Sequence, residues 1–310
     1  MPIPDTMKNL LRLFSEKEPD ITESYRLERA LKNSVKGHRL LSAAIRSGDT
    51  ALGVDGRKVS LRICTPLGHN EESRSALLFF HGGGWVTESV DTYIDVCINL
   101  ANYTKCKVIA VEYSLAPEFP FPCALEDCYA AAREIITNPA EYGLGDEEIV
   151  LVGDSAGGNL AAAVSLMARD RGEFSVSRQV LIYPSVGNDY SESSPFKSVR
   201  TNGTDYILTA KRIEEYQALY ASSEEDYHNP YFAPILAEDL SRQPDTMILT
   251  AEFDPLRDEG EAYGIKLKNA GNNVKIYRLK NTLHGFISLN PSVKPVHKAY
   301  ELIAEYIQNV

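Results

Sequence analysis

Short apolar segments alternate with segments of helical periodicity along most of the chain. The apolar segments predict strands at residues 75–80, 107–112, 149–152, 180–183, 247–250 and 274–279. The periodic segments predict helices at residues 90–103, 124–136, 160–168, 256–270 and 296–307. Strands and helices that alternate with short links indicate a mostly parallel central sheet with helices on both faces.

Two parts of the chain lie outside this alternation. Near the N-terminus, after about 20 irregular residues, Thr22 could cap a helix that runs to about residue 35. Its apolar residues predict the buried side of that helix: Tyr25, Leu27, Ala30, Leu31 and Val35. Two short strands are then expected within residues 52–66, joined by the turn pair Asp55-Gly56.

The second part is residues 187–225, which are largely polar and include an expected helix at 210–221. Such a segment is too long for a simple link in a compact fold, which indicates a functional role. We therefore predict a single domain over residues 1–310. Its cap over the strand ends is formed by about residues 1–50 and about 187–225.

The most informative local pattern is Gly153-x-Ser155-x-Gly157, which follows an apolar strand and precedes an alanine-rich helix. The glycines allow a sharp turn between strand and helix, with Ser155 at its apex. The turn lifts the hydroxyl clear of the sheet and places it at a helix N-terminus, where free N–H groups can receive negative charge. Such a pattern also occurs by chance, so further elements are needed.

A serine hydroxyl becomes a good nucleophile when a histidine takes its proton and a carboxylate orients that histidine. Of six histidines, His284 is best placed, because it follows the expected strand at 274–279. Asp254 follows the strand at 247–250, although Glu252 and Asp258 compete with it and an acid there could simply cap a helix. The chain order Ser155, Asp254, His284 is typical of an α/β-hydrolase.

A further element is His81-Gly82-Gly83-Gly84, directly after the expected strand at 75–80. Glycines let the backbone approach a substrate closely and turn its N–H groups toward a developing oxyanion. The alternative is a merely flexible loop. The serine turn in the same chain argues against this alternative.

These motifs together resemble the hormone-sensitive-lipase-like (bacterial HSL, type IV) carboxylesterases of the α/β-hydrolase superfamily. The matching segments are HGGGW at 81–85, YSLAPEFPFPCALED at 113–127, GDSAGGNL at 153–160, DPLRDEG at 254–260 and HGF at 284–286. The resemblance implies Ser155 as nucleophile with Asp254 and His284 as its partners. It also implies an oxyanion hole of Gly83, Gly84 and Ala156, with His81 as structural support of the glycine loop.

One position departs from the family pattern, because Ser114 stands where the family usually has arginine. This puts a supporting contact in doubt and leaves the catalytic set untouched. Trp85, Tyr183 and Phe286 are candidate substrate-pocket residues, with Tyr206 and Phe232 as weaker candidates. Plain packing is the alternative for each of these aromatic side chains.

The expected activity is hydrolysis of short-chain carboxylic esters through an acyl-enzyme, with no metal or organic cofactor. The same machinery could serve a deacylase of an amide, a formamide or an acetylated sugar. A non-catalytic receptor of similar fold is disfavoured, because plant gibberellin receptors lack the catalytic histidine and His284 is present here. Family members often pair through an edge strand, so a homodimer is compatible with the resemblance.

Charge and composition narrow the partners. The net charge of −11 argues against nucleic acid and against attraction to an anionic membrane. No segment approaches the ~20 apolar residues of a membrane span. The five cysteines are odd in number and fit no metal-binding spacing. Without a recognisable export signal, we expect a cytoplasmic protein with reduced thiols that acts on small-molecule esters.

Overall fold

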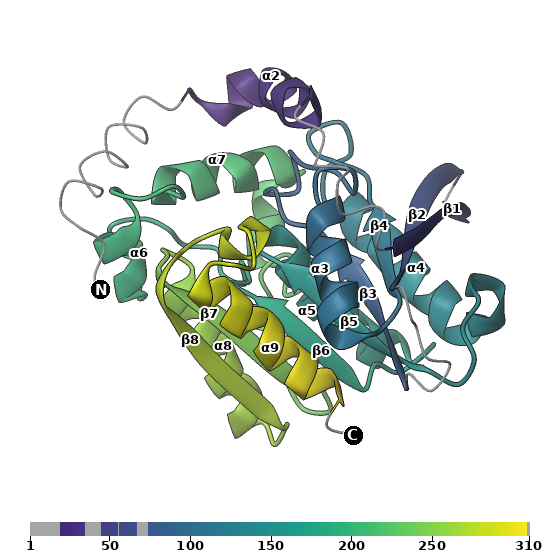
Figure 1. Ribbon diagram of the computed structural model, residues 1–310. Coiled ribbons are helices and arrows are strands. Elements are labelled where there is room, and N and C mark those ends of the chain that lie inside the picture. The colour runs from purple at the N-terminus through teal and green to yellow at the C-terminus, as the bar shows by residue number, and fades with distance from the viewer. Residues whose placement is uncertain (1–18, 35–44, 55, 67–73, 309–310) are drawn as a thin grey trace.

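The structure is a computed structural model that describes residues 19–34, 45–54, 56–66 and 74–308 (Figure 1). Within these residues, eight strands form one sheet in the order β1-β2-β4-β3-β5-β6-β7-β8. Their bounds are β1 Ile45–Val54, β2 Arg57–Pro66, β3 Ser75–Phe80, β4 Val108–Glu112, β5 Glu148–Asp154, β6 Arg178–Ile182, β7 Asp245–Phe253 and β8 Val274–Leu283. The strands from β3 to β8 pair in parallel, whereas β1 and β2 are antiparallel at one edge. The sheet is thus mostly parallel, as predicted.

The hairpin at the sheet edge is longer than the sequence indicated. Its first strand begins at Ile45, and Val54 pairs with Arg57 across a two-residue turn. Gly56 has a φ of +79°, which suits the left-handed conformation that this kind of turn requires. The polar residues of β1 kept its first part from being predicted as a strand, because an edge strand needs apolar residues on only one side.

Helices cover both faces of the sheet (Figure 1). On one face lie α3 (Ile94–Thr104) and α9 (Lys294–Gln308), and on the other lie α4 (Cys123–Thr137), α5 (Ala156–Arg171) and α8 (Arg257–Asn269). Strand β3 shows why its sequence is continuously apolar: Leu77 and Phe79 pack toward α3 and α9, whereas Leu78 and Phe80 pack toward α4 and α5. Successive side chains of a strand point to opposite faces, and both faces are buried here.

Three helices lie beyond the carboxyl ends of the parallel strands: α2 (Ile21–Ser34), α6 (Lys197–Asn202) and α7 (Ala210–Tyr220) (Figure 1). The start of α2 is joined to α7, because Glu215 Oε2 accepts the N–H of Ile21 at 3.2 Å. Arg212 also donates to the Pro19 carbonyl at 2.8 Å. The two segments outside the strand–helix alternation therefore meet. Short 3₁₀ turns complete the described elements: η2 Pro139–Tyr142, η3 Glu224–His228, η4 Pro234–Leu236 and η5 Phe286–Ser288.

Helix α2 corrects two of the predictions. Asp20, and not Thr22, caps the helix, because the Asp20 carboxylate accepts the N–H of Thr22 at 2.8 Å. Tyr25 is buried as expected, but Leu27 and Leu31 are 63% and 58% exposed. The predicted buried side was wrong at these positions and at Ala30, which is also exposed. The predicted Val35, like residues 1–18, lies outside the described residues.

Candidate active site

Ser155 sits at the junction of β5 and α5, with a φ of +54° and a ψ of −118°. This strained conformation needs glycines on either side of the serine. A Cβ on Gly153 would lie 2.1 Å from the Gly157 carbonyl oxygen, and a Cβ on Gly157 would lie 2.0 Å from the Phe80 carbonyl oxygen. The strand, the turn and the helix therefore lie too close together for residues 153 and 157 to carry a side chain. The turn is sharp for the steric reason that the sequence suggested.

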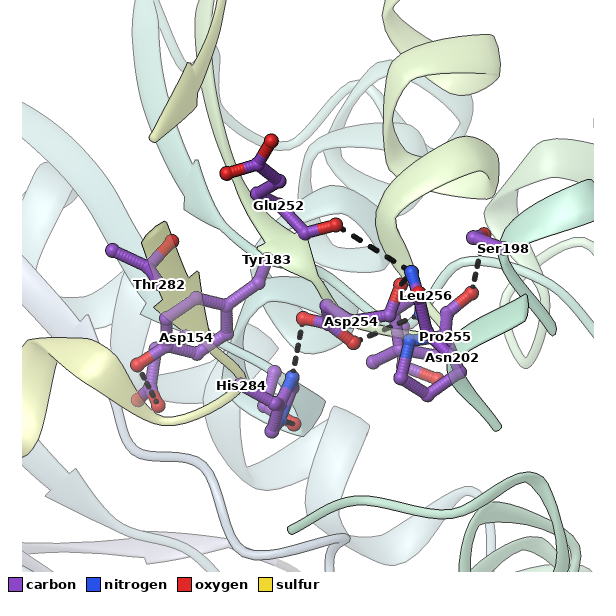
Figure 2. Close-up of polar contacts among 12 residues, drawn as sticks. Asp154, Tyr183, Ser198, Asn202, Glu252, Asp254, Pro255, Leu256, Thr282 and His284 are labelled. Carbon is purple, nitrogen blue, oxygen red and sulfur yellow. Dashed lines mark hydrogen bonds and ion pairs between the residues drawn. The ribbon is translucent and has the colours of Figure 1, made fainter. Parts of the chain in front are cut away.

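Two side chains that follow successive strands form a hydrogen-bonded series with Ser155. His284 Nε2 is 2.9 Å from the Ser155 hydroxyl, and His284 Nδ1 is 2.7 Å from Asp254 Oδ2. Figure 2 shows Asp254 directed at the histidine ring, with its second oxygen accepting the N–H of Leu256 at 2.9 Å. The Asp254 side chain is fully buried and that of His284 is 13% exposed. A buried carboxylate whose two oxygens each accept a hydrogen bond can fix the orientation and tautomer of an imidazole.

The competing carboxylates point elsewhere. Glu252 accepts the N–H of Asn281 at 2.7 Å, and Asp258 accepts the N–H of Ser198 at 2.8 Å. Asn202 of α6 donates to the main-chain carbonyl of Asp254 at 3.1 Å, which supports the loop after β7 (Figure 2). Sequence reasoning missed Asn202, because nothing in a local segment connects it to Asp254, 52 residues away.

The glycine loop lies beside the serine turn. Gly83 and Gly84 have φ values of +104° and +61°, and a Cβ on Gly84 would lie 2.4 Å from the Tyr216 ring. Both glycines and Ala156, the first residue of α5, line the same cavity as Ser155 and His284. A side chain at either glycine would be strained or would clash. All three residues thus line the cavity that contains the serine.

His81 lies beneath this loop and away from the serine. It is buried, its Nδ1 donates to the Gly82 carbonyl at 2.7 Å, and its ring stacks on Tyr113 at 4.3 Å between centroids. Burial lowers the pKa of His81 below its usual range. A neutral ring that bonds the loop backbone fits the supporting role implied by the family resemblance.

Asp154 is a second buried carboxyl group next to the serine. Its Oδ2 accepts the hydroxyls of Tyr93 at 2.9 Å and Tyr183 at 3.3 Å. Burial raises the pKa of Asp154 to about 7, against the opposing effects of these hydrogen bonds and of His284. The group therefore changes its charge near neutral pH beside the histidine.

Ser114, the position that departs from the family pattern, lies beside the buried carboxylate of Asp127. Its backbone N–H donates to Asp127 at 2.9 Å, and the guanidinium of Arg57 reaches the other oxygen of this buried carboxylate at 2.7 Å. Strand β2 thus supplies a cation to the carboxylate next to Ser114.

A cavity of about 490 Å³ opens above Ser155. Its apolar wall comes mainly from α7 and from the segments around α6 and η5, including Leu208, Ile213, Leu283, Phe286 and Leu289. Another part of its wall is charged and is formed by Glu28 and Lys32 of α2 together with Glu88. One cavity thus combines an apolar surface with a charged one.

The predicted pocket residues divide into two groups. Phe286 and Trp85 border the cavity, although each residue is only 1% exposed, and the Trp85 ring stacks on Tyr220 at 4.5 Å. Tyr183 is fully buried and does not line the cavity, so its prediction as a pocket residue was wrong: its ring lies against His284 and behind it. The weaker candidates also pack elsewhere, Tyr206 on Phe253 and Phe232 on Tyr220.

Comparison with known proteins agrees with this geometry. A family model described as the α/β-hydrolase fold matches residues 77–288. The chain belongs to the α/β-hydrolase family. An arylesterase from Saccharolobus solfataricus is 32% identical to this α/β-hydrolase, with 93% of each chain covered. An ethyl acetate hydrolase from Pseudomonas putida is 33% identical over 82% of this chain and 79% of its own.

Solved structures show the same relationship. A hyperthermophilic esterase from Pyrobaculum calidifontis is 35% identical and superposes with a TM-score of 0.84, covering 99% of this chain and 98% of its own. This α/β-hydrolase is therefore a carboxylic ester hydrolase of the hormone-sensitive-lipase-like group. Its substrates are small-molecule esters. None of the helices in the described part of the chain is long and apolar enough to cross a membrane.

Proposed function

We propose that this protein hydrolyses short-chain carboxylic esters through an acyl-enzyme formed on Ser155. The observation that carries the proposal is the hydrogen-bonded series from Ser155 through His284 to Asp254, with distances of 2.9 and 2.7 Å. The cavity of about 490 Å³ above the serine has room for a small ester. We further propose that α2, α6 and α7 form the cap of a single domain and enclose this cavity.

In the first half of the reaction, His284 Nε2 takes the proton of the Ser155 hydroxyl while Oγ attacks the ester carbonyl carbon. Asp254 holds the Nδ1–H of the ring and stabilises the imidazolium that forms. The carbonyl oxygen becomes an oxyanion that accepts hydrogen bonds from the N–H groups of Gly83, Gly84 and Ala156. The intermediate then expels the alcohol, which receives the proton from His284.

In the second half, water replaces the alcohol. His284 takes a proton from water as the water oxygen attacks the acyl carbon, and the same three N–H groups receive the second oxyanion. Collapse of this intermediate releases the carboxylic acid and returns the proton to Ser155. No metal or organic cofactor takes part in these steps, and activity that survives dialysis against a strong chelator is the expected result.

Substitutions test the roles of Ser155 and Asp254. Ser155→Ala should lower ester turnover by several orders of magnitude, as removal of a triad member does elsewhere. Asp254→Asn should reduce kcat much more than it changes KM, whereas Asp258→Asn is the matched control for a carboxylate that faces Ser198. A fully active Ser155→Ala variant, or damage by Asp258→Asn with none by Asp254→Asn, would refute the assignment.

Two properties remain predictions from the sequence. We propose a cytoplasmic location, which cell fractionation tests directly. We also propose that the chain can form a homodimer, as members of this family often do, and light scattering of the purified protein tests that assembly.

A further inference from the structure

The C-terminal half of α2 is attached to the rest of the protein by charged groups. Leu27 and Leu31 are largely exposed, so apolar packing contributes little there. Arg29 donates instead to the carbonyl oxygens of Val86 and Ala116 and pairs with Glu118 at 2.9 Å. One turn later, Lys32 makes a second set of contacts with the segment that follows the glycine loop.

The Lys32 ammonium binds that segment at two points. It lies 2.6 Å from Glu88 Oε1 and 3.2 Å from the Thr87 hydroxyl, and it also pairs with Glu28 at 2.9 Å. Burial acts to lower the pKa of Lys32, but Tyr216 and the two carboxylates outweigh it and raise the pKa, so the side chain stays charged. A charged group with three partners fixes its neighbours more firmly than an exposed ion pair would.

Thr87 carries the contact to the glycine loop. Its hydroxyl and its N–H both donate to the Gly83 carbonyl, at 3.0 and 2.9 Å. Because a peptide unit is planar and trans, the direction of the Gly83 carbonyl sets the opposite direction of the Gly84 N–H. Glu88 contributes too, since its Cγ lies 2.6 Å from where a Cβ of Gly83 would be. Only two contacts therefore separate Lys32 from the peptide that carries the Gly84 N–H.

The backbone of the segment that follows the glycine loop is strained and therefore needs support from its neighbours. Trp85 and Glu88 have φ values of +59° and +60°, a conformation that residues with side chains rarely adopt. Strained segments keep their geometry only when the surrounding structure holds them. Lys32 and Arg29 supply such contacts from a helix that lies outside the sheet and its covering helices.

We infer that Lys32 is a positioning residue for the oxyanion hole, which acts through Thr87 and Glu88 on the direction of the Gly84 N–H. Helix α2 then does more than enclose the cavity: it aligns a donor that works in the transition state. This inference rests on the proposed function, because it requires an oxyanion to form at Ser155.

Two pairs of variants separate this role from general stability. Lys32→Met should lower kcat about 10-fold with KM nearly unchanged, less than the ~100-fold or greater loss expected when a donor is removed outright. Lys32→Arg should recover most of the activity, because it keeps the charge. Thr87→Val should repeat the loss and Thr87→Ser should not, since only serine keeps the hydroxyl bond to Gly83. Lys268→Met is the control, because Lys268 is an exposed lysine of α8 that does not line the cavity.

A trifluoromethyl ketone provides the readout that loss of packing alone would not move. It adds to Ser155 and forms an oxyanion, so its inhibition constant should rise in Lys32→Met and Thr87→Val by the same factor by which kcat/KM falls. Non-additive effects in the double variant would support action through one path. Unchanged kcat in both single variants, or a rise in KM alone in Lys32→Met, would overturn the inference. Failure of the proposed function looks different: Ser155→Ala would stay active and the ketone would inhibit no variant.

Discussion

The ring of Tyr183 lies 4.6 Å from the ring of His284, centroid to centroid, at an angle of 55°. Tyr183 has a φ of +35°, and its hydroxyl donates to Asp154, so backbone and side chain are both held (Figure 2). His284 is thus bonded along its edge by Asp254 and Ser155 and supported on its face by a fixed aromatic ring. This contact limits the ways in which the imidazole can tilt.

We predict that Tyr183→Phe and Tyr183→Leu differ sharply. Phenylalanine keeps the ring and loses one hydrogen bond, at about 1 kcal/mol of unfolding free energy, so kcat should change little. Leucine removes the face contact and leaves a cavity that costs roughly 3 kcal/mol, and kcat should fall clearly. Urea unfolding and steady-state kinetics on both variants measure these effects. Equal kcat values for the two variants would show that the face contact does not matter.

The serine turn predicts a steric limit. Gly157→Ala would place a Cβ 2.0 Å from the Phe80 carbonyl oxygen, and backbone cannot yield that far without separating strand from helix. This variant should lose its activity and its cooperative unfolding. Gly53→Ala is the control, because a Cβ at Gly53 has nothing within 4 Å. An active, stably folded Gly157→Ala protein would contradict the geometry of the turn.

Stability should depend on pH through Glu259. This buried side chain accepts the N–H groups of Val186 and Gly187 on one oxygen, and burial raises its pKa from 4.5 to about 8. The folded protein therefore holds a proton that the unfolded chain releases, and this contribution is complete below about pH 4.5. It is lost progressively as the pH rises toward 8.

Glu259→Gln should accordingly flatten the fall in unfolding free energy between pH 4.5 and 8, as followed by urea unfolding at several pH values. Glu224→Gln removes an exposed carboxylate and controls for the change in net charge. The same slope in all three proteins would mean that Glu259 does not bind the extra proton.

The cavity predicts a limited acyl length. Each added methylene gains about 0.8 kcal/mol while there is apolar surface to cover it, and a chain that exceeds the space loses roughly 1–3 kcal/mol by overpacking. For p-nitrophenyl esters from acetate to palmitate, kcat/KM should rise and then fall, with a maximum between about two and six carbons. A steady rise to palmitate, with a jump when the substrate forms an emulsion, would indicate a lipase instead.

Much of the site could be predicted because its elements are local. The turn at Ser155 needs glycines that stand beside it in the sequence, and His284 and Asp254 each follow a strand that a short apolar segment marks. The carboxyl ends of parallel strands meet at one edge, so residues far apart in the chain could be expected to converge there. The alternation of strands and helices likewise predicted the layers of the fold, because apolar segments and helical periodicity are also local features of the sequence.

Other features depend on contacts between distant segments. Nothing around Lys32 indicates that it reaches Thr87, and nothing around Arg57 indicates that it pairs with Asp127, because each pair forms only once the sheet and the cap are assembled. The apolar residues of α2 predicted a buried side at Leu27 and Leu31, yet polar contacts hold that half of the helix. Tyr183 was a candidate for the pocket, with plain packing as the alternative, and its ring lies against His284.

The central claim is that Ser155 becomes acylated, and covalent labelling tests it most directly. A fluorophosphonate should add once to the intact protein, and peptide mapping by mass spectrometry should place the adduct on Ser155. Ser155→Ala should take up no label, and denatured wild-type protein should take up none either, because His284 and the N–H donors no longer act on the serine. A stoichiometric adduct on another residue, with Ser155 unmodified in active enzyme, would contradict the account.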